Sequence, residues 1–565
     1  MSFEVWAPDA DRVEVVIDAD RHPLGRGERG WWRGGPEVAD GTDYLFRIDG
    51  GPERPDPRSR HLPDGVHGPS RITRLDAPAT DPVPIDLAKT VVEEIHVGTF
   101  SDEGTFDGAV AHLDHLVDVG VTAVELMPVN AFPGVHGWGY DGVGLWAVHE
   151  PYGGPTGLRR LVDEAHRRGL SVILDVVHNH LGPDGNYLAD FGPYFTDRFS
   201  TPWGDAVNLD GPGSDGVREF LIESALAAVT DFGLDGLRLD AVHALLDTSA
   251  VHLLEELAVE VHRLGRPVTL IAESDLNDPR LIRDREAGGY GLNAQWSDDF
   301  HHGLHVALTG ERTAYYSDFS GLADVATALE RGYVYDGRFS AHRDRRHGRP
   351  LGGLPGHRLL GYAQNHDQIG NRARGDRLSH QCGHRLAAVG AVITLTSPFV
   401  PMLFQGEEWA ASTPFPYFTD HQDEALAAAV RLGRRREWAA FGWDPAEIPD
   451  PQDPATFAAA KLRWDERAEE PHTGMLDLHR RLLRLRAATP ALTDGRLDLV
   501  TATADESAGT LVVERGDVVV VANTSAEEQL LDAYGGAEVA VATDDVEPIA
   551  GRVRMHPTSA AVLGR

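Results

Sequence analysis

Cysteine is almost absent from this sequence, because Cys382 is the only one in 565 residues. A single cysteine excludes an internal disulfide framework and a zinc site built from cysteines. The sequence also lacks any stretch close to the roughly 18 apolar residues that a membrane span needs. Its first residues, MSFEVWAPDADRVEVV, lack the basic start and apolar run of a secretory signal. We therefore expect a cytoplasmic protein in a reducing compartment.

Positive charge is the second scarce property. The chain has 52 lysines and arginines against 88 aspartates and glutamates, which gives a net charge of −36. This excess of negative charge disfavours binding to nucleic acid and to anionic membranes, since both reward a basic face. We expect a neutral or cationic ligand, and predict neither a nucleic acid nor a membrane as a partner.

The pattern of the sequence changes twice, as expected for a chain too long for one ordinary domain. Residues 1–85 carry short β-rich runs such as Phe3–Trp6 and Val13–Ile17, which predict an N-terminal β-sandwich. Residues 86–484 alternate strand and helix patterns, which predicts a large α/β domain. Residues 485–565 return to short alternating runs such as Thr510–Arg515, which predict a C-terminal β-sandwich.

The middle segment contains eight candidate strands: Val92–Val97, Ala123–Met127, Ser171–Val177, Gly236–Val242, Thr269–Glu273, Gly291–Trp296, Leu360–Gln364 and Val400–Phe404. Helical patterns between them include Phe106–Val119, Gly157–Arg168, Gly216–Phe232 and Ser249–Leu264. Eight strand–helix units in series predict a (β/α)8 TIM barrel, with a doubly wound sheet as the alternative. Long insertions follow the third strand (178–210) and the sixth (298–355), on the face that carries active sites in this fold.

Four candidate strands end in acidic, histidine or arginine residues. These ends read Asp175-Val-Val-His178-Asn179-His180, Arg238-Leu-Asp240-Ala-Val-His243, Glu273-Ser-Asp275 and Gln364-Asn365-His366-Asp367. Charged side chains in apolar strands are costly unless they are paired or used. Because four strands share this feature at the same end, a catalytic role explains it better than four separate ion pairs.

These residues suit the cleavage of a glycosidic bond, which needs one ionised and one protonated carboxyl group. Arg238 lies two residues before Asp240, on the same face of the strand, and a neighbouring guanidinium favours the charged form of a carboxylate. Nearby carboxylates can raise the pKa of Glu273, so that it holds a proton near neutral pH. Adjacent strands would place the two carboxyl groups about 5–5.5 Å apart, which predicts retention of anomeric configuration.

Three further residues complete this predicted site. Asp367 can hold sugar hydroxyls and stabilise the positive charge that develops on the ring. His180 and His366 can donate hydrogen bonds to those hydroxyls.

In order and placement, the four segments resemble the signature regions of the α-amylase superfamily, glycoside hydrolase family 13. The resemblance implies that Asp240 is the nucleophile, Glu273 the acid/base and Asp367 the transition-state stabiliser. It also implies supporting roles for Arg238, His180 and His366. Tyr140, in Gly-Trp-Gly-Tyr-Asp-Gly, matches the tyrosine that stacks under the sugar in the cleaved subsite. The N-terminal sandwich resembles a carbohydrate-binding module, and we expect it to brace the barrel.

The surrounding segments are similar to those of the malto-oligosyltrehalose trehalohydrolase family. They include Ile-His96-Val-Gly-Thr-Phe, Gln295-Trp296-Ser-Asp298-Asp-Phe300, Asn371-Arg372 and Phe404-Gln-Gly-Glu407-Glu408-Trp409. The resemblance implies hydrolysis of the α-1,4 bond next to the terminal trehalose of malto-oligosyltrehalose, which releases trehalose and a maltodextrin. It also implies functional coupling to a synthase that produces this substrate.

Three alternatives to this function stay open. An α-1,4-glucan branching enzyme, which has a similar domain arrangement, would transfer a chain to a sugar hydroxyl instead of water. Another α-amylase-type hydrolase would act on plain maltodextrins. A non-catalytic glucan-binding protein would usually lack one of the acids, and this chain has all three.

Two further residues are substrate-binding candidates. His243, three residues past Asp240, either contacts the leaving-group sugar or packs at a helix start. Trp296 belongs to a set of aromatic residues that either stack on sugar rings or buttress loops; the others are Trp138, Trp203 and Phe300. Asp175 is expected to have a structural role, and His178 is left unassigned.

No metal and no cofactor are predicted. Asn179 sits where many amylases bind calcium, but the loop after it lacks a close Asp-x-Asp pattern. The stretch His301-His302-Gly-Leu-His305 lacks an acidic partner that would complete a recognisable set of metal ligands.

Overall fold

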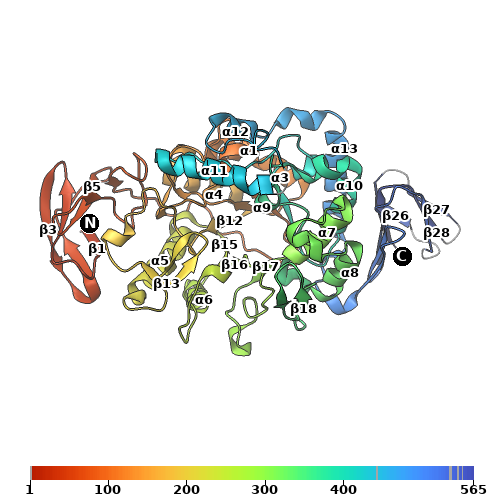
Figure 1. Cartoon of the computed structure of the whole chain (residues 1–565), viewed down its shortest axis with the longest axis horizontal. Helices are drawn as coiled ribbons and strands as arrows, with labels where there is room; N and C mark the ends of the chain where they lie inside the picture. Colours follow the sequence, from red (N-terminus) through yellow and green to blue (C-terminus); the bar gives the residue numbers. More distant parts are fainter. Residues whose placement is uncertain (1–2, 441–442, 533–537, 544–545, 550–551, 565) are drawn as a thin grey trace.

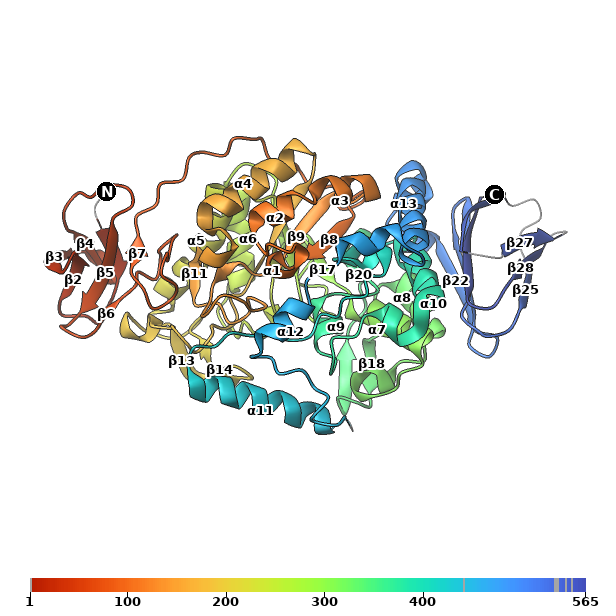
Figure 2. The same cartoon turned by 90° about the horizontal axis from the view of Figure 1, so that it is seen from above.

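The computed structural model describes residues 3–440, 443–532, 538–543, 546–549 and 552–564. Three parts lie in a row along the longest axis, with a β-rich module at each end of a central barrel (Figures 1 and 2). The predicted fold class, a (β/α)8 barrel with β-modules before and after it, is confirmed. No helix in the described ranges is long and apolar enough to cross a membrane.

All eight candidate strands form one closed barrel. They are β8 (Val92–Ile95), β9 (Ala123–Leu126), β12 (Ser171–Val176), β15 (Gly236–Leu239), β16 (Thr269–Ala272), β17 (Ala294–Trp296), β20 (Leu359–Tyr362) and β21 (Val400–Phe404). Every neighbouring pair is parallel, and β8 closes the ring against β21. Closure excludes the doubly wound alternative, which needs an open sheet.

Helices surround the barrel. They are α1 (Val97–Phe100), α2 (Phe106–Val110), α3 (Leu113–Val119), α4 (Gly154–Arg167), α5 (Ser214–Phe232), α6 (Leu253–Arg263), α7 (Asp298–Thr309), α8 (Leu322–Arg331), α9 (His366–Gly370), α10 (Leu378–Leu395), α11 (Glu424–Ala440), α12 (Pro454–Ala459), α13 (His472–Ala488) and α14 (Pro490–Thr493). The predicted helix over 106–119 is thus two helices, and α6 begins four residues later than predicted.

The fifth connection departs from a regular barrel. Between β16 and β17, all of whose residues are described, the only helical element is the 3-10 turn Arg285–Ala287. The intervening sequence contains Pro279 and the glycines Gly288, Gly289 and Gly291. Proline and glycine are the two residue types that destabilise a helix interior most, so a full helix does not form here.

The insertions gather on the face where the strands end. The insertion after β12 contains the hairpin β13 (Phe195–Thr201) and β14 (Gly204–Val207). The insertion after β17 contains α7, α8 and the hairpin β18 (Asp336–Ser340) and β19 (Arg345–Gly348). A third insertion, after β21, contains α11, which stands apart from the barrel strands in Figure 2.

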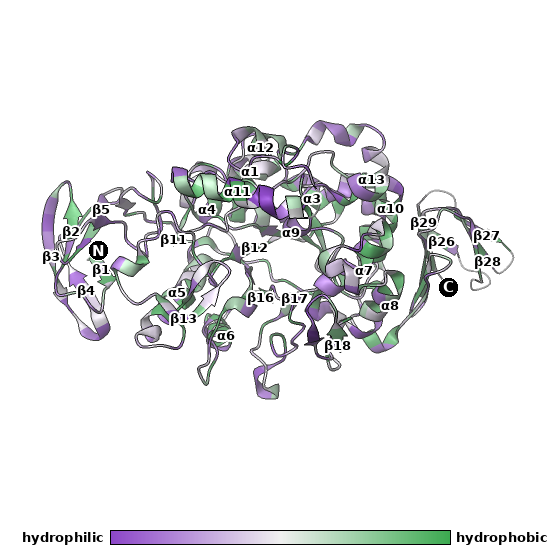
Figure 3. Cartoon of the chain, in the orientation of Figure 1, coloured by the Kyte–Doolittle hydropathy of each residue, from purple (hydrophilic) through white to green (hydrophobic). Residues whose placement is uncertain are grey.

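The N-terminal module is an antiparallel sheet of β1 (Phe3–Trp6), β2 (Val13–Ile17), β3 (Asp20–Arg26), β4 (Trp31–Gly34), β5 (Asp43–Ile48), β6 (Glu53–Arg54) and β7 (Ser70–Arg71). Phe3 and Tyr44, from strands far apart in the sheet order, have ring centroids 4.9 Å apart. The sheet therefore folds over a shared core. Strand β3, which is mostly exposed, is mostly hydrophilic (Figure 3). Trp6 packs against Tyr194 of the barrel insertion, in keeping with a bracing role.

The C-terminal module has two antiparallel sheets. The larger contains β22 (Val500–Asp505), β23 (Thr510–Arg515), β24 (Val518–Asn523), β29 (Ser559–Gly564) and β26 (Glu538–Ala542). The smaller contains β25 (Gln529–Asp532), β28 (Arg552–Met555) and β27 (Val546–Ile549). Helix α13 crosses residue 485, and the domain boundaries at 85 and 485 stay predictions.

Asp235 joins three segments at the end of the barrel opposite the insertions. It precedes β15 and is buried. Its carboxylate accepts hydrogen bonds from the backbone N–H groups of Val83 (3.0 Å) and Val172 (2.9 Å). It also lies 2.8 Å from Nε2 of His166 in α4. These contacts hold the entry segment, the third strand and a helix together.

We expect Asp235→Ala to lower the thermal midpoint without changing activity at 25 °C. The substitution leaves buried donors without an acceptor, which costs about 1–3 kcal/mol for each group. Thermal unfolding followed by circular dichroism measures the effect. The control Asp215→Ala removes a carboxylate from an exposed ion pair with Arg29 and is expected to change stability by less than about 0.5 kcal/mol. An equal midpoint for both variants would contradict this role.

Candidate active site

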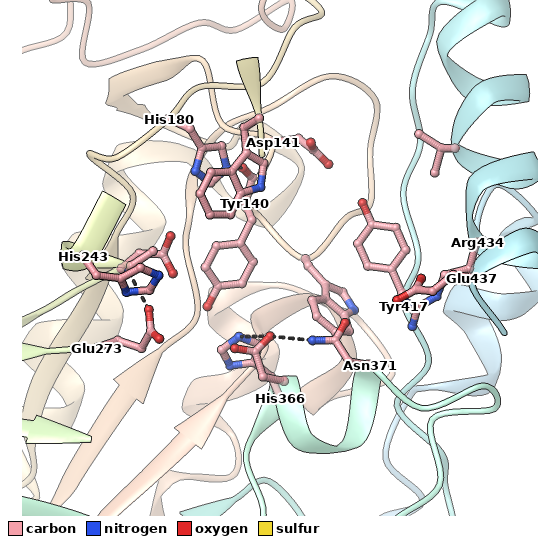
Figure 4. Close-up of a pocket in the computed structure, with 16 residues that line it drawn as sticks. Tyr140, Asp141, His180, His243, Glu273, His366, Asn371, Tyr417, Arg434 and Glu437 are labelled. Atoms are coloured by element: carbon pink, nitrogen blue, oxygen red, sulfur yellow. Dashed lines mark hydrogen bonds and ion pairs between the residues drawn. The ribbon is translucent and has the colours of Figure 1, made fainter. Parts of the chain in front are cut away.

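Side chains from the strand ends surround one cavity of about 500 Å³ at the mouth of the barrel (Figure 4). Its walls comprise Trp138, Tyr140, Asp141, His180, Trp203, Asp240, Ala241, His243, Glu273, His366, Asp367, Asn371, Tyr417, Val430, Arg434 and Glu437. Seven of the nine predicted site residues line it. The other two, Arg238 and Trp296, lie buried beneath it.

Arg238 is the centre of the charged site. Its Nη1 lies 2.6 Å from Oδ1 of Asp240 and donates a 2.9 Å hydrogen bond to Oδ2 of Asp175. Its Nη2 lies 3.7 Å from Oε2 of Glu273. One fully buried guanidinium therefore faces three carboxyl groups. The predicted spacing of the Asp240 and Glu273 carboxyl groups stays a prediction, but both lie beside the same cation.

Asp240 is fixed from two sides. Asn179 donates hydrogen bonds from Nδ2 to Oδ2 of Asp240 (2.7 Å) and to its backbone oxygen (2.9 Å). The Asn179 side chain, considered above for calcium, therefore orients the carboxylate. Among the residues that the structure describes, no group of three or more His, Cys, Asp or Glu side chains is placed to hold a metal ion.

Glu273 lies in a site that favours its protonated form. Burial raises the pKa of Glu273 to about 8, and the carboxylates of Asp240 and Asp367 add to this rise against the opposing charge of Arg238. The backbone N–H of Ala241 donates a 2.5 Å hydrogen bond to Oε2 of Glu273. Ala241 adopts φ +38°, a left-handed conformation that is costly for alanine and typical of functional sites.

Asp367 lies in the first turn of α9 and is more exposed than the other two acids. Nδ2 of Asn371 donates a 3.1 Å hydrogen bond to its Oδ1, and Nε2 of His366 lies 3.5 Å from the same oxygen. His366 and Asp367 begin the short helix α9 and Asn371 directly follows it, so the helix fixes their relative positions.

Glu94, on β8, holds His366 in place. Its two carboxylate oxygens lie 2.5 Å from Nδ1 and 2.9 Å from the backbone nitrogen of His366. Burial alone would lower the pKa of His366, but the charges of Glu94 and Asp367 raise it to about 9. His366 is therefore an imidazolium at neutral pH, and its Nε2–H faces the cavity beside Asp367.

Tyr140 stands in the middle of the group of cavity residues, near His366 (Figure 4). Its ring stacks on His366 with centroids 5.1 Å apart, and its hydroxyl donates a 2.6 Å hydrogen bond to Asp175. Asp175 thus has the structural role expected of it. Gly139 precedes Tyr140 with φ +97°, and a Cβ there would lie 2.2 Å from the backbone oxygen of Pro128, so this turn requires glycine.

His180 and Trp203 form a second wall. Their rings are stacked, with centroids 4.4 Å apart and an interplanar angle of 6°. Nε2 of His180 lies 3.0 Å from the backbone oxygen of Tyr140. Trp203 is 49 % exposed, so its outer face is open to a ligand. This exposed indole comes from the insertion after β12.

Trp296 corrects an expectation, because it does not line the cavity. Its side chain is only 2 % exposed, and its ring lies 4.3 Å from the guanidinium carbon of Arg238. The short strand β17 points this indole into the barrel interior, where it packs under the cation. Phe300 is likewise buried, against Phe399.

Sequence reasoning missed six residues of the site: Glu94, Asp141, Asn371, Tyr417, Arg434 and Glu437. Glu94 carries the same signal as the predicted acids, a charge in an apolar strand, and this signal could have identified it. Asp141 and Asn371 stand inside segments already noted. Tyr417 and the residues of α11 do not directly follow a strand, so no pattern in the neighbouring sequence identifies them as residues of the cavity.

Known proteins are similar to this chain over most of its length. The model of the alpha amylase catalytic domain matches residues 71–194. A malto-oligosyltrehalose trehalohydrolase of Arthrobacter ramosus is 51 % identical over 92 % of this chain and 92 % of its own. One of Rhizobium sp. (strain M-11) is 47 % identical over 99 % and 97 %.

The chain belongs to the malto-oligosyltrehalose trehalohydrolase family. A crystal structure of a Salmonella typhimurium protein, provisionally assigned as an alpha amylase, superposes on this family member with a TM-score of 0.90. It is 35 % identical and covers 100 % of this chain and 97 % of its own. The trehalohydrolase family thus accounts for the whole length of the chain, including both β-modules.

The pH dependence of this trehalohydrolase-family site follows from Glu273. An acid that must donate a proton is active below its pKa, so we expect kcat/KM to fall as the pH rises through about 8. Initial rates between pH 5 and pH 10 would test this. A rate that is constant up to pH 10 would contradict the assignment of Glu273 as the proton donor.

We expect Glu94→Gln to move the alkaline limit of activity to lower pH. Without the Glu94 carboxylate, only the charge of Asp367 still opposes the effect of burial, so the pKa of His366 falls and the imidazolium loses its proton at a lower pH than in the wild type. The variant should lose more activity at pH 8 than at pH 5.5, whereas a merely structural effect would lower both equally. A pH profile of unchanged shape would contradict this role of Glu94.

Proposed function

We propose that the protein hydrolyses the α-1,4-glucosidic bond next to the terminal trehalose of malto-oligosyltrehalose and releases trehalose and a maltodextrin. The observation that carries the proposal is the convergence of Asp240, Glu273 and Asp367 on one cavity. The relatives named as malto-oligosyltrehalose trehalohydrolases support the choice of substrate.

In the first step, Glu273 donates its proton to the glycosidic oxygen as the bond to C1 breaks. The Asp240 carboxylate attacks C1 from the opposite face and forms a covalent glycosyl–enzyme ester, while trehalose leaves with the proton. Arg238 and Asn179 hold Asp240 in place before the attack. Little reorientation of the nucleophile is then needed.

In the second step, the Glu273 carboxylate removes a proton from a water molecule whose oxygen attacks C1. The ester bond to Asp240 breaks, and the maltodextrin leaves with its original anomeric configuration. Asp367, open to the cavity, stabilises the positive charge that develops on the ring in both steps. His366 and His180 hold ring hydroxyls, and Tyr140 stacks below the ring.

His243 stands at the Glu273 end of the cavity (Figure 4). It is exposed, which suits a contact with the leaving trehalose. Coupling to a synthase that produces malto-oligosyltrehalose and a cytoplasmic location both stay predictions. Malto-oligosyltrehalose or a related α-1,4-glucan is the only partner proposed.

Product analysis tests the proposal. Purified protein is incubated separately with malto-oligosyltrehalose and with plain maltodextrin, and the products are identified by chromatography and NMR. We expect release of trehalose from the first substrate with α-anomeric maltodextrin as the initial product. Glucose or maltose without trehalose would indicate another amylase-type hydrolase, and new α-1,6 linkages would indicate a branching enzyme.

We expect Glu273→Gln to lower kcat about 10²–10⁴-fold, the usual contribution of a general acid. A substrate with a fluoride leaving group needs no proton, so the variant should still form the covalent intermediate with it. The control Glu286→Gln, in the same connection but exposed, should retain full activity. Equal losses on both substrates would contradict the role of Glu273 as proton donor.

A further inference from the structure

The catalytic cavity continues past the three acids to a second wall. A volume of about 500 Å³ falls within the range of about 300–1,000 Å³ typical of sites that enclose drug-sized ligands. His243 and Glu273 stand at one end of the cavity, and Tyr417, Arg434 and Glu437 at the other, with Tyr140 between them (Figure 4). The cavity therefore has room on both sides of the reacting ring.

The direction of the substrate follows from the positions of the acids. A leaving group departs on the side of its proton donor, here the end with Glu273 and His243. The sugar bound to Asp240 must then continue toward the opposite end. That end is formed by α11 and by the segment that contains Tyr417, so this wall faces the part of the substrate that stays bound after the first step.

The chemistry of this wall suits a sugar. The ring of Tyr417 is half-buried. It packs edge-to-face against Trp138, with the ring centroids 5.2 Å apart. The guanidinium of Arg434 lies 5.4 Å from the Tyr417 ring centre, and its Nη1 lies 3.1 Å from Oε2 of Glu437. Val430 adds an apolar contact. An aromatic face beside a charged donor and acceptor fits the apolar face and the hydroxyls of a pyranose.

We propose that the α11 wall, defined as Tyr417, Val430, Arg434 and Glu437, binds the second glucose unit of the α-1,4-glucan chain retained on the enzyme. This inference rests on the proposed function, because it assumes that the leaving group is trehalose. The wall would then make hydrolysis faster for substrates with at least two glucose units beyond trehalose.

Arg434 also connects this wall to the catalytic machinery. Its Nη2 donates a 2.6 Å hydrogen bond to the backbone oxygen of Gly370. Gly370 is the last residue of α9, the helix that carries Asp367. The guanidinium is mostly buried, while Glu437 is half exposed. Removal of Arg434 can thus act in two ways, through the second glucose and through Asp367.

Two substrates separate these effects. Glucosyltrehalose has one glucose beyond trehalose and does not reach the wall, whereas maltosyltrehalose has two and does. The measured quantity is the ratio of kcat/KM for maltosyltrehalose to that for glucosyltrehalose. We expect a ratio well above one in the wild type, and a ratio about tenfold lower in Tyr417→Ala and Arg434→Met, as expected for the loss of one good contact.

The matched control is Arg436→Met, on the same helix, exposed and outside the cavity, which should leave the ratio unchanged. Tyr417→Phe retains the ring and should retain most of the ratio. If Tyr417→Ala fails to fold by circular dichroism, Glu437→Gln tests the same wall from its exposed rim. Rates that fall equally for both substrates would show that the wall acts only through Asp367, and would overturn the proposal.

The two hypotheses fail in different ways. Wild-type protein that releases no trehalose from either substrate would contradict the proposed function. Wild-type protein that releases trehalose from both, with a ratio unchanged in Tyr417→Ala, Arg434→Met and Glu437→Gln, would contradict only the role of the α11 wall.

Discussion

The site depends on one buried cation. Arg238 is fully enclosed, and its guanidinium faces Asp240, Asp175 and Glu273. A buried carboxylate without a counter-charge is unstable, so this guanidinium is what allows several acids to stand so close together. Trp296 covers its face from below. The cation thus balances part of the negative charge of the acids around it, while burial raises the pKa of Glu273 to about 8.

Much of the fold could be predicted because the barrel follows simple patterns. The eight strands are buried on both sides and appear as short apolar runs, and each ended within a few residues of its predicted limit. The fifth connection is the exception. Pro279 and the glycines Gly288, Gly289 and Gly291 disfavour a helix there, and only a 3-10 turn forms. The break between α2 and α3 lies at Ala111–His112. Neither residue is a proline or a glycine, so the sequence did not predict a break there.

Within the site, residues at strand ends could be predicted and residues brought by long insertions could not. Asp240, Glu273 and Asp367 follow strands whose order fixes their meeting point. Tyr417 and Arg434 reach the cavity only through the path of the segment after β21, which no local pattern determines. Trp296 shows the opposite case: its place at the end of a predicted strand suggested a side chain in the cavity, but the indole is buried beneath Arg238.

The contact between Glu94 and His366 joins residues 272 positions apart. Glu94 belongs to the first barrel strand, while His366 follows the seventh, and the eighth strand β21 lies between β20 and β8 in the closed ring. An unclosed chain therefore cannot place the Glu94 carboxylate against His366, however well its separate strand–helix units are formed. The histidine therefore has its buried counter-charge only in a chain whose barrel is closed.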